Sequence, residues 1–169
     1  MKVIIKKTKL KNVLVIKPYK FQDFRGSFIE TYNLLFFNKK VRKIKFVQDD
    51  ISISKKNVLR GIHGDNKTWK LVSCLLGKIY LIVVNNDIKS KDYRKWMSLT
   101  LSDRNNLQVL IPPKYGNAYV ALSKKVIYSY KQSTYYNRKS QFTIHWKDPK
   151  FKFKWPIKKP ILSFRDKFI

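Results

Sequence analysis

The stretch VLRGIHGDNKTWKLVSCLLGKIYLIVV, residues 58–84, decides the fold class of this chain. Its first part, LRGIHGD (59–65), predicts a strand that runs into a turn. Its second part begins an apolar run, 69–86, rich in Val, Ile and Leu. Short apolar runs bounded by Gly, Asn and Asp are typical of strands, and the residues here do not recur at helical spacing. This region therefore predicts neighbouring β-strands.

The same strand-like pattern of short apolar runs continues along the chain. Further apolar or alternating runs occupy residues 3–10, 12–18, 44–54, 96–102, 107–113, 117–123, 125–133 and 141–148. Only 28–40, FIETYNLLFFNKK, has helical spacing and predicts a short helix. Many short strands at intervals near ten residues predict an all-β antiparallel sandwich or barrel. Because no linker interrupts the pattern, we expect one domain, 1–169, that ends in a less regular extension, 149–169.

The charge is high and evenly spread. There are 38 Lys and Arg residues against 10 Asp and Glu, which gives a net charge of +28. Such a charge favours anionic ligands, and a nucleotide diphosphate would benefit from it as much as DNA. The Lys-, Ile- and Asn-rich composition is also what an AT-biased genome supplies. Since the lysines do not gather in a tail or on one helix, we do not expect nucleic acid to be the main partner.

The chain offers no sign of an oxidising compartment or of a membrane. Cys74 is the single cysteine, so no intrachain disulfide can form. No apolar run reaches the roughly 18 residues of a membrane span, and the first residues alternate apolar and charged side chains. We therefore expect a cytoplasmic protein with no membrane partner.

The two histidines, His63 and His145, are too few for a His-rich metal site, and no other ligands stand near them at ligand spacing. We therefore expect no metal. If 59–65 is a regular strand, Leu59, Gly61 and His63 share one face. Lys70 can then return beside His63 across a tight connection. Such a cluster suits removal of a carbon-bound proton, with His as the base and the Lys ammonium holding the enolate oxygen.

Seven motifs in order carry a resemblance to a known family. The quoted motifs are FQDFRGSFIETYN (21–33), FVQDDISISKKNVLRGIH (46–63), KLV (70–72), LIPPKYGNAYVALS (110–123), YKQSTYY (130–136), WKDPKFKFKWP (146–156) and ILSFRD (161–166). Together they resemble the dTDP-4-dehydrorhamnose 3,5-epimerase family, nearly end to end. The resemblance implies a cupin-type antiparallel jelly-roll barrel with short flanking helices. It also implies a cofactor-independent epimerase of a nucleotide-linked 4-keto-6-deoxy sugar that serves surface polysaccharide biosynthesis.

The resemblance implies roles for individual residues. His63 matches the base, Asp166 its carboxylate partner, Tyr130 the acid on the opposite face of the sugar, and Lys70 the group that holds the enolate. The implied contacts to the substrate or its nucleotide are Arg25, Phe28, Glu30, Gln48, Arg60 and Tyr136, with Arg60 and Arg25 at the diphosphate. No cofactor is needed, because the C4 carbonyl makes the adjacent C–H acidic. The resemblance further implies a homodimer in which residues 21–33 complete the partner's site.

Three departures stand out. The family turn G-F-A-H-G-F reads KYGNAY here, which puts Asn117 in the place of a histidine and among the candidate substrate contacts. The Asp-x-Arg after the central apolar strand reads VVNND, and the loop between His63 and Lys70 is shorter. These changes resemble the branch that acts on GDP-linked 4-keto-6-deoxy-heptoses. They also raise the hypothesis that C3 or C5 alone is inverted.

Alternatives remain open at this point. The same fold and base serve sugar-nucleotide 3,4-ketoisomerases, and a third possibility is a non-catalytic anion- or nucleic-acid-binding β-barrel. Tyr130 could be a packing residue of an aromatic strand, and Asp166 a helix cap or ion-pair partner. We expect Trp155 to be a core residue and His145 a strand residue without a special role.

Overall fold

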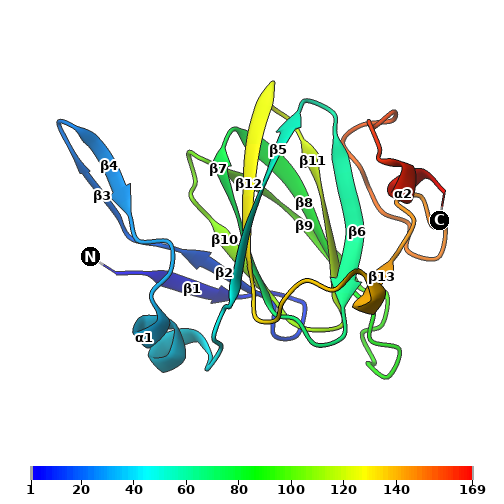
Figure 1. Cartoon of the computed structure of the whole chain (residues 1–169), viewed down its shortest axis with the longest axis horizontal. Helices are drawn as coiled ribbons and strands as arrows, with labels where there is room; N and C mark the ends of the chain where they lie inside the picture. The colour runs from blue at the N-terminus through cyan, green and yellow to red at the C-terminus, as the bar shows by residue number, and fades with distance from the viewer. Residues whose placement is uncertain (1, 169) are drawn as a thin grey trace.

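The computed structural model describes residues 2–168 and consists of two antiparallel sheets that face each other (Figure 1). The six-stranded sheet has the order β1 (Ile4–Lys7), β2 (Leu14–Lys17), β10 (Gln108–Ile111), β7 (Lys70–Leu76), β12 (Lys125–Gln132) and β5 (Gln48–Lys55). The five-stranded sheet has the order β13 (Gln141–Thr143), β6 (Leu59–Asp65), β11 (Tyr115–Ala121), β8 (Lys78–Asn85) and β9 (Trp96–Ser102). The predicted all-β antiparallel architecture is confirmed.

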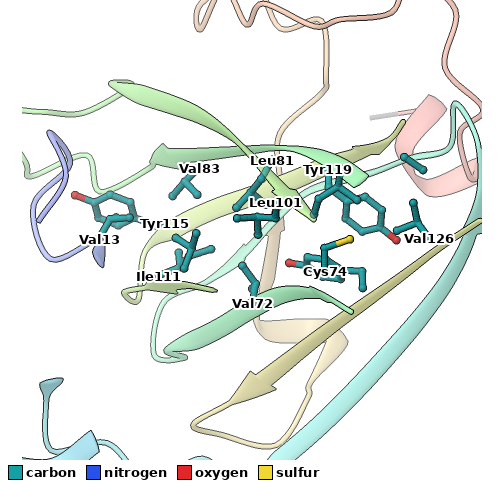
Figure 2. Packing of buried hydrophobic residues seen from close by; sticks show 14 of the residues in the cluster. Val13, Val72, Cys74, Leu81, Val83, Leu101, Ile111, Tyr115, Tyr119 and Val126 are labelled. Atoms are coloured by element: carbon teal, nitrogen blue, oxygen red, sulfur yellow. The ribbon is translucent and has the colours of Figure 1, made fainter. Parts of the chain in front are cut away.

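The main core lies between the two sheets, where alternate residues of each strand point inward (Figure 2). Val72 and Ile111 from the six-stranded sheet meet Leu81, Val83 and Leu101 from the five-stranded sheet, and all are buried. Removal of these apolar side chains from water stabilises the fold by about 1.5–3 kcal/mol for each fully buried residue. The packed core therefore holds the two sheets in fixed positions, and with them the side chains that lie between the sheets.

The C-terminal extension covers the outer face of the five-stranded sheet. Phe151 and Trp155 from the extension pack against Ile62, Val84 and Leu59, which project from the outer side of the sheet. The indole Nε1–H of Trp155 donates to the backbone oxygen of Trp146 at 2.8 Å. The prediction of Trp155 as a core residue is therefore confirmed.

A second layer covers the outer face of the six-stranded sheet. Asn33 caps the short helix α1 (Leu34–Phe36), which continues as the π-helical turn η1 (Phe37–Val41). Phe37 packs there with Leu71 and Leu110 of the sheet. The predicted helix over 28–40 thus begins six residues late, because residues 28–29 belong to a strand.

That strand forms a hairpin that the sequence pattern did not predict. β3 (Lys20–Asp23) pairs only with β4 (Gly26–Ile29), and Figure 1 shows the hairpin projecting from the end of the molecule opposite the C-terminal helix α2 (Phe164–Lys167). Both of its faces are largely exposed, so no alternation of buried and exposed residues marks it. Phe24 at its tip is 98% exposed.

The structure divides one predicted apolar run into two strands and corrects the prediction for His145. The apolar run 69–86 forms two strands, β7 and β8, which meet at Gly77; its φ of +80° and a backbone oxygen 2.4 Å from the Cβ position require glycine. His145 lies beyond the end of β13 and is not a strand residue; its Nδ1 accepts from the backbone N–H of Lys147. The remaining short element is the 3₁₀ turn η2 (Arg138–Ser140). No helix among residues 2–168 is long and apolar enough to span a membrane.

Candidate active site

A cavity of about 380 Å³ opens at one end of the sandwich, between the two sheets. Polar and aromatic side chains of β5, β6, β7, β11 and β12 surround it, together with residues near α2. The lining residues are Gln48, Asp50, Ser52, Arg60, His63, Lys70, Asn117, Tyr119, Tyr128, Tyr130, Gln132, Tyr136, Gln141, Ser163, Arg165 and Asp166. Eight of the eleven residues predicted from the sequence are among them.

A bulge in β6 directs two of these side chains into the cavity. In the pairing with β11, Asn117 lies opposite His63 and Tyr119 opposite Arg60, so β6 carries one residue more than β11 over this interval. Gly61 occupies the bulge, where a Cβ atom would lie 2.6 Å from the backbone oxygen of Asn117. A bulge of this kind re-aims the strand, so Arg60 and His63, three residues apart, line the same cavity.

The prediction that Leu59, Gly61 and His63 share one face is therefore wrong. Leu59 packs on the outer side of the sheet with Val120 and Trp146, whereas His63 faces inward. A regular strand would alternate sides at every residue, and the extra residue at the bulge shifts that alternation by one.

The imidazole of His63 is held by Asp166, which reaches it from α2. The two atoms, Nε2 of His63 and Oδ1 of Asp166, are 2.7 Å apart. Ser163, the N-cap of α2, donates from Oγ to the other carboxylate oxygen of Asp166 at 2.9 Å. With the proton of a neutral imidazole on Nε2, Nδ1 is the nitrogen that can accept a proton.

Asp166 is suited to hold a protonated imidazole. Its side chain is 4% exposed, and burial by itself raises the pKa of a carboxyl group. The hydrogen bonds and charge supplied by His63 and Ser163 outweigh burial, so the pKa of Asp166 lies below its ordinary value. Asp166 is thus an ionised partner for His63.

Lys70 enters the cavity from the first position of β7, in the opposite sheet. Burial lowers the pKa of its ammonium group to about 8; Asp65 opposes this change and Arg165 adds to it. His63 and Lys70 both line the cavity, on strands that follow each other across the short connection predicted from the sequence. Lys70 can donate hydrogen bonds to an oxyanion there.

Three tyrosines form an aromatic wall. Tyr119 stacks on Tyr128 with ring centroids 4.4 Å apart, and Tyr128 is followed by Tyr130 at 5.6 Å. Burial, with Asp50 as the next cause, raises the pKa of Tyr130 above its ordinary value. Tyr130 therefore keeps its proton at neutral pH. It comes from β12 of the six-stranded sheet, whereas His63 comes from the other sheet.

Asn117 has an unpaired acceptor. Its Nδ2 donates to the hydroxyl of Tyr128 at 3.1 Å, whereas its Oδ1 is buried and has no hydrogen-bond partner within residues 2–168. An unsatisfied buried acceptor costs about 1–3 kcal/mol. A donor from a ligand in the cavity would remove that cost.

A group of amides lies around Asp50. Its carboxylate accepts from Nε2 of Gln48 at 2.9 Å and from Nε2 of Gln132 at 3.0 Å. The side-chain oxygen of Gln48 in turn accepts from the backbone N–H of Tyr136 at 2.7 Å. These contacts hold Gln48 and Tyr136 in the cavity wall, and their contact with a ligand stays a prediction.

Arg25, Phe28 and Glu30 do not line the cavity of their own chain. Arg25 lies on the turn of the projecting hairpin, where its guanidinium pairs with Asp23 at 2.7 Å, and Phe28 on β4 is 72% exposed. The sequence assigned these residues to a partner's site, and their placement leaves that assignment as a prediction.

The sequence analysis missed half of the cavity wall, notably Asp50, Ser52, Tyr119 and Tyr128. One signal was available: polar residues recur with period two at Gln48, Asp50 and Ser52, which marks a strand face that points into a polar site.

The cavity contains acidic and basic side chains. Its cations, Arg60, Lys70 and Arg165, suit an anionic ligand. No group of three metal-ligating side chains occurs in the described part of the chain.

The chain is similar to known proteins over nearly its whole length. The family model described as dTDP-4-dehydrorhamnose 3,5-epimerase matches residues 7–169. The enzyme of that name from Salmonella typhimurium is 38% identical over 169 residues, which cover 97% of this chain and 92% of the relative. The one from Methanothermobacter thermautotrophicus is 34% identical, covering 89% and 83%.

Solved structures are similar throughout. A dTDP-6-deoxy-D-glucose-3,5-epimerase from Legionella pneumophila, in complex with dTDP-4-keto-L-rhamnose, superposes with a TM-score of 0.92 and 31% identity over 98% of this chain and 90% of that one. The Bacillus anthracis enzyme, with TDP and PPi bound, gives a TM-score of 0.95 and 28% identity over 99% and 98%. The likeness confirms the cupin-type jelly roll, and this chain belongs to the dTDP-4-dehydrorhamnose 3,5-epimerase family.

Proposed function

We propose that this protein inverts a stereocentre next to the C4 ketone of a nucleotide-linked 4-keto-6-deoxy sugar, without a cofactor. The observation that carries the proposal is the pair of His63 and Asp166 at 2.7 Å, inside a cavity that also contains Tyr130 and Lys70. Inversion requires a base and an acid on opposite faces of the sugar ring, because the proton leaves one face and returns to the other. The origin of His63 and Tyr130 in opposite sheets supports this arrangement.

Four residues share the proton transfers and the charge stabilisation of the reaction. His63 takes the proton from the carbon beside the ketone on Nδ1, and Asp166 stabilises the resulting imidazolium. The C–H bonding electrons move to the C4 oxygen, where Lys70 donates hydrogen bonds to the enolate. Tyr130 then protonates the carbon from the opposite side. Its raised pKa keeps it in the acid form that this step needs.

The nucleotide occupies the outer part of the site. Arg60 is exposed at the cavity edge and meets the diphosphate, while Gln48 and Tyr136 contact the substrate. The unpaired Oδ1 of Asn117 accepts from a sugar hydroxyl. Such a contact distinguishes sugars, because a substrate without that hydroxyl leaves the buried oxygen unsatisfied.

The active form is a homodimer in which the β3–β4 hairpin completes the neighbour's site. Its exposed Phe24 and Phe28 need a partner surface, and Arg25 adds a charge for the diphosphate. The hairpin does not reach the cavity of its own chain. A second copy of the chain supplies what one chain lacks.

The names of the similar proteins bear on the identity of the nucleotide and the sugar. The similar proteins act, by their names, on dTDP-linked sugars, which supports a dTDP-4-keto-6-deoxy-hexose. The GDP-4-keto-6-deoxy-heptose branch, proposed from Asn117 and the short loop before Lys70, stays a prediction. So do a cytoplasmic location and a place in polysaccharide biosynthesis.

One substrate panel tests the function. The protein is incubated with dTDP- and GDP-linked 4-keto-6-deoxy sugars, and NMR of the products gives the configuration at C3 and C5 and the position of the carbonyl. We expect inversion with the carbonyl retained at C4. A carbonyl at C3 would identify a 3,4-ketoisomerase, and no turnover of any member would support a non-catalytic binding protein.

A further inference from the structure

A chain of hydroxyl groups connects the two sheets at the wall of the cavity. The Nε–H of Arg60 donates to Oγ of Ser54 at 3.0 Å, and Ser54 Oγ lies 2.9 Å from the hydroxyl of Tyr119. The same Tyr119 hydroxyl lies 2.8 Å from Oγ of Ser52. Arg60 and Tyr119 are register partners on β6 and β11, whereas both serines belong to β5 of the opposite sheet.

The donor at one end of this chain favours one continuous direction for its hydrogen bonds. A guanidinium has only donors, so Ser54 must accept from Arg60. In the direction that uses each hydroxyl hydrogen once along the chain, Ser54 donates to Tyr119 and Tyr119 donates to Ser52. Ser54 and Tyr119 are buried, at 4% and 2% exposure. The hydrogen that remains belongs to Ser52, which lines the cavity.

We infer that Ser52, Tyr119 and Ser54 form a directional hydrogen-bond relay that holds Arg60 in place and ends in a donor for the same anion. Ser52 donates to a phosphate oxygen of the nucleotide beside Arg60. Tyr119 is a positioning residue: its hydroxyl contacts both serines and thereby orients the two groups that meet the anion. The inference deepens the proposed function and rests on its assignment of Arg60 to the diphosphate.

The hydrogen bonding of the Arg60 guanidinium supports an anionic ligand. Its guanidinium forms no ion pair with a carboxylate among residues 2–168, and its second recorded bond is a long one, 3.4 Å, to the backbone oxygen of Ile53. The guanidinium is thus held mainly through Nε, and its terminal nitrogens carry only this one long contact within the described residues. Holding a flexible arginine before the ligand arrives reduces the entropy lost on binding.

The test measures binding with a variant that keeps the packing. Tyr119→Phe retains the stacked ring and removes only the hydroxyl that joins the two serines. Calorimetric titration with dTDP and GDP should show a Kd raised roughly three- to tenfold, the usual net scale for one hydrogen bond. Affinity for thymidine and guanosine, which carry no phosphate, should stay the same. In turnover, KM should rise and kcat should stay unchanged.

Matched variants make the result decisive. Tyr80→Phe removes a hydroxyl that donates to the backbone oxygen of Lys154 outside the cavity, and it should bind like the wild type. Ser52→Ala should reproduce the loss seen with Tyr119→Phe, and the double variant should lose less than the product of the two. If Tyr119→Phe does not fold, Ser54→Ala replaces it in the same comparison.

Two outcomes would overturn the inference, and a third concerns the function. Wild-type affinity for both diphosphates in Tyr119→Phe, while Arg60→Ala weakens binding, would show that the relay does not prepare the anion site. An equal loss for nucleosides and diphosphates would show a merely structural role. If Arg60→Ala itself binds diphosphates normally, the proposed role of Arg60 fails, and the relay with it.

Discussion

Asp166 and His63 meet at 2.7 Å although 103 positions separate them in the chain. The contact exists because α2 folds back against β6, and because Ser163 holds the second carboxylate oxygen at the start of that helix. A base that must become positively charged during the reaction is thus paired in advance with a buried carboxylate.

That pairing predicts the effect of Asp166→Asn. The amide keeps the size of the side chain but loses its charge, so it no longer stabilises the imidazolium. We expect the epimerisation rate to fall on the order of a hundredfold, within the range for impaired general-base catalysis. Ser163→Ala, which leaves the carboxylate in place, should cost much less. Equal rates for Asp166→Asn and the wild type would show that the pair is structural.

Lys70 predicts an alkaline limit to activity. Its pKa is lowered to about 8 by burial, so the ammonium loses its proton as the pH rises through that value. Because only the ammonium carries a charge to stabilise the enolate, kcat/KM should decline above about pH 8, and this parameter reports the free enzyme. Lys70→Ala should lower the rate about 10²- to 10³-fold, the scale for loss of an oxyanion donor. It should also abolish the decline near pH 8. A decline that persists unchanged in Lys70→Ala belongs to another group.

Tyr130→Phe separates epimerisation from enolisation. The variant keeps the ring beside Tyr128 and removes only the hydroxyl. His63 should still remove the proton from one face of the sugar ring and return a deuteron from deuterated water to the same face. Inverted product should fall about a hundredfold or more, the scale for loss of a positioned acid. If inversion continues at the wild-type rate, another group or a water is the acid, and Tyr130 is a packing residue.

The hairpin predicts a dependence on the second subunit. Arg25→Ala should weaken binding of nucleoside diphosphates and leave the unfolding transition unchanged, since Arg25 contacts no core residue and pairs only with Asp23 among the described residues. Arg104→Ala, an exposed arginine in the turn between β9 and β10, is the matched control. Unchanged affinity in Arg25→Ala would count against the shared site, as would full activity in a protein that is monomeric at micromolar concentration.

Much of this molecule could be predicted from local patterns. Period-two runs of Val, Ile and Leu identified most strands of the sandwich, because half-buried strands alternate inward and outward residues. Arg60, His63 and Lys70 could be grouped because β6 and β7 follow each other across a short connection.

The rest depends on partners distant in the sequence. The bulge at Gly61 is set by the register with β11, so no local pattern in 59–65 shows that Arg60, and not Leu59, shares the face of His63. The β3–β4 hairpin exposes both faces and thus lacks the alternation that marks a strand. The relay through Tyr119 joins residues more than 60 positions apart.

The central claim is that His63 removes a carbon-bound proton next to the ketone. Its most direct test is proton NMR of a dTDP-linked 4-keto-6-deoxy sugar incubated in deuterated water with the wild type and with His63→Asn. The wild type should incorporate deuterium at C3, C5 or both. The folded variant should be slower by about two to four orders of magnitude, the range for loss of a general base. Deuterium uptake at the wild-type rate in His63→Asn would contradict the account.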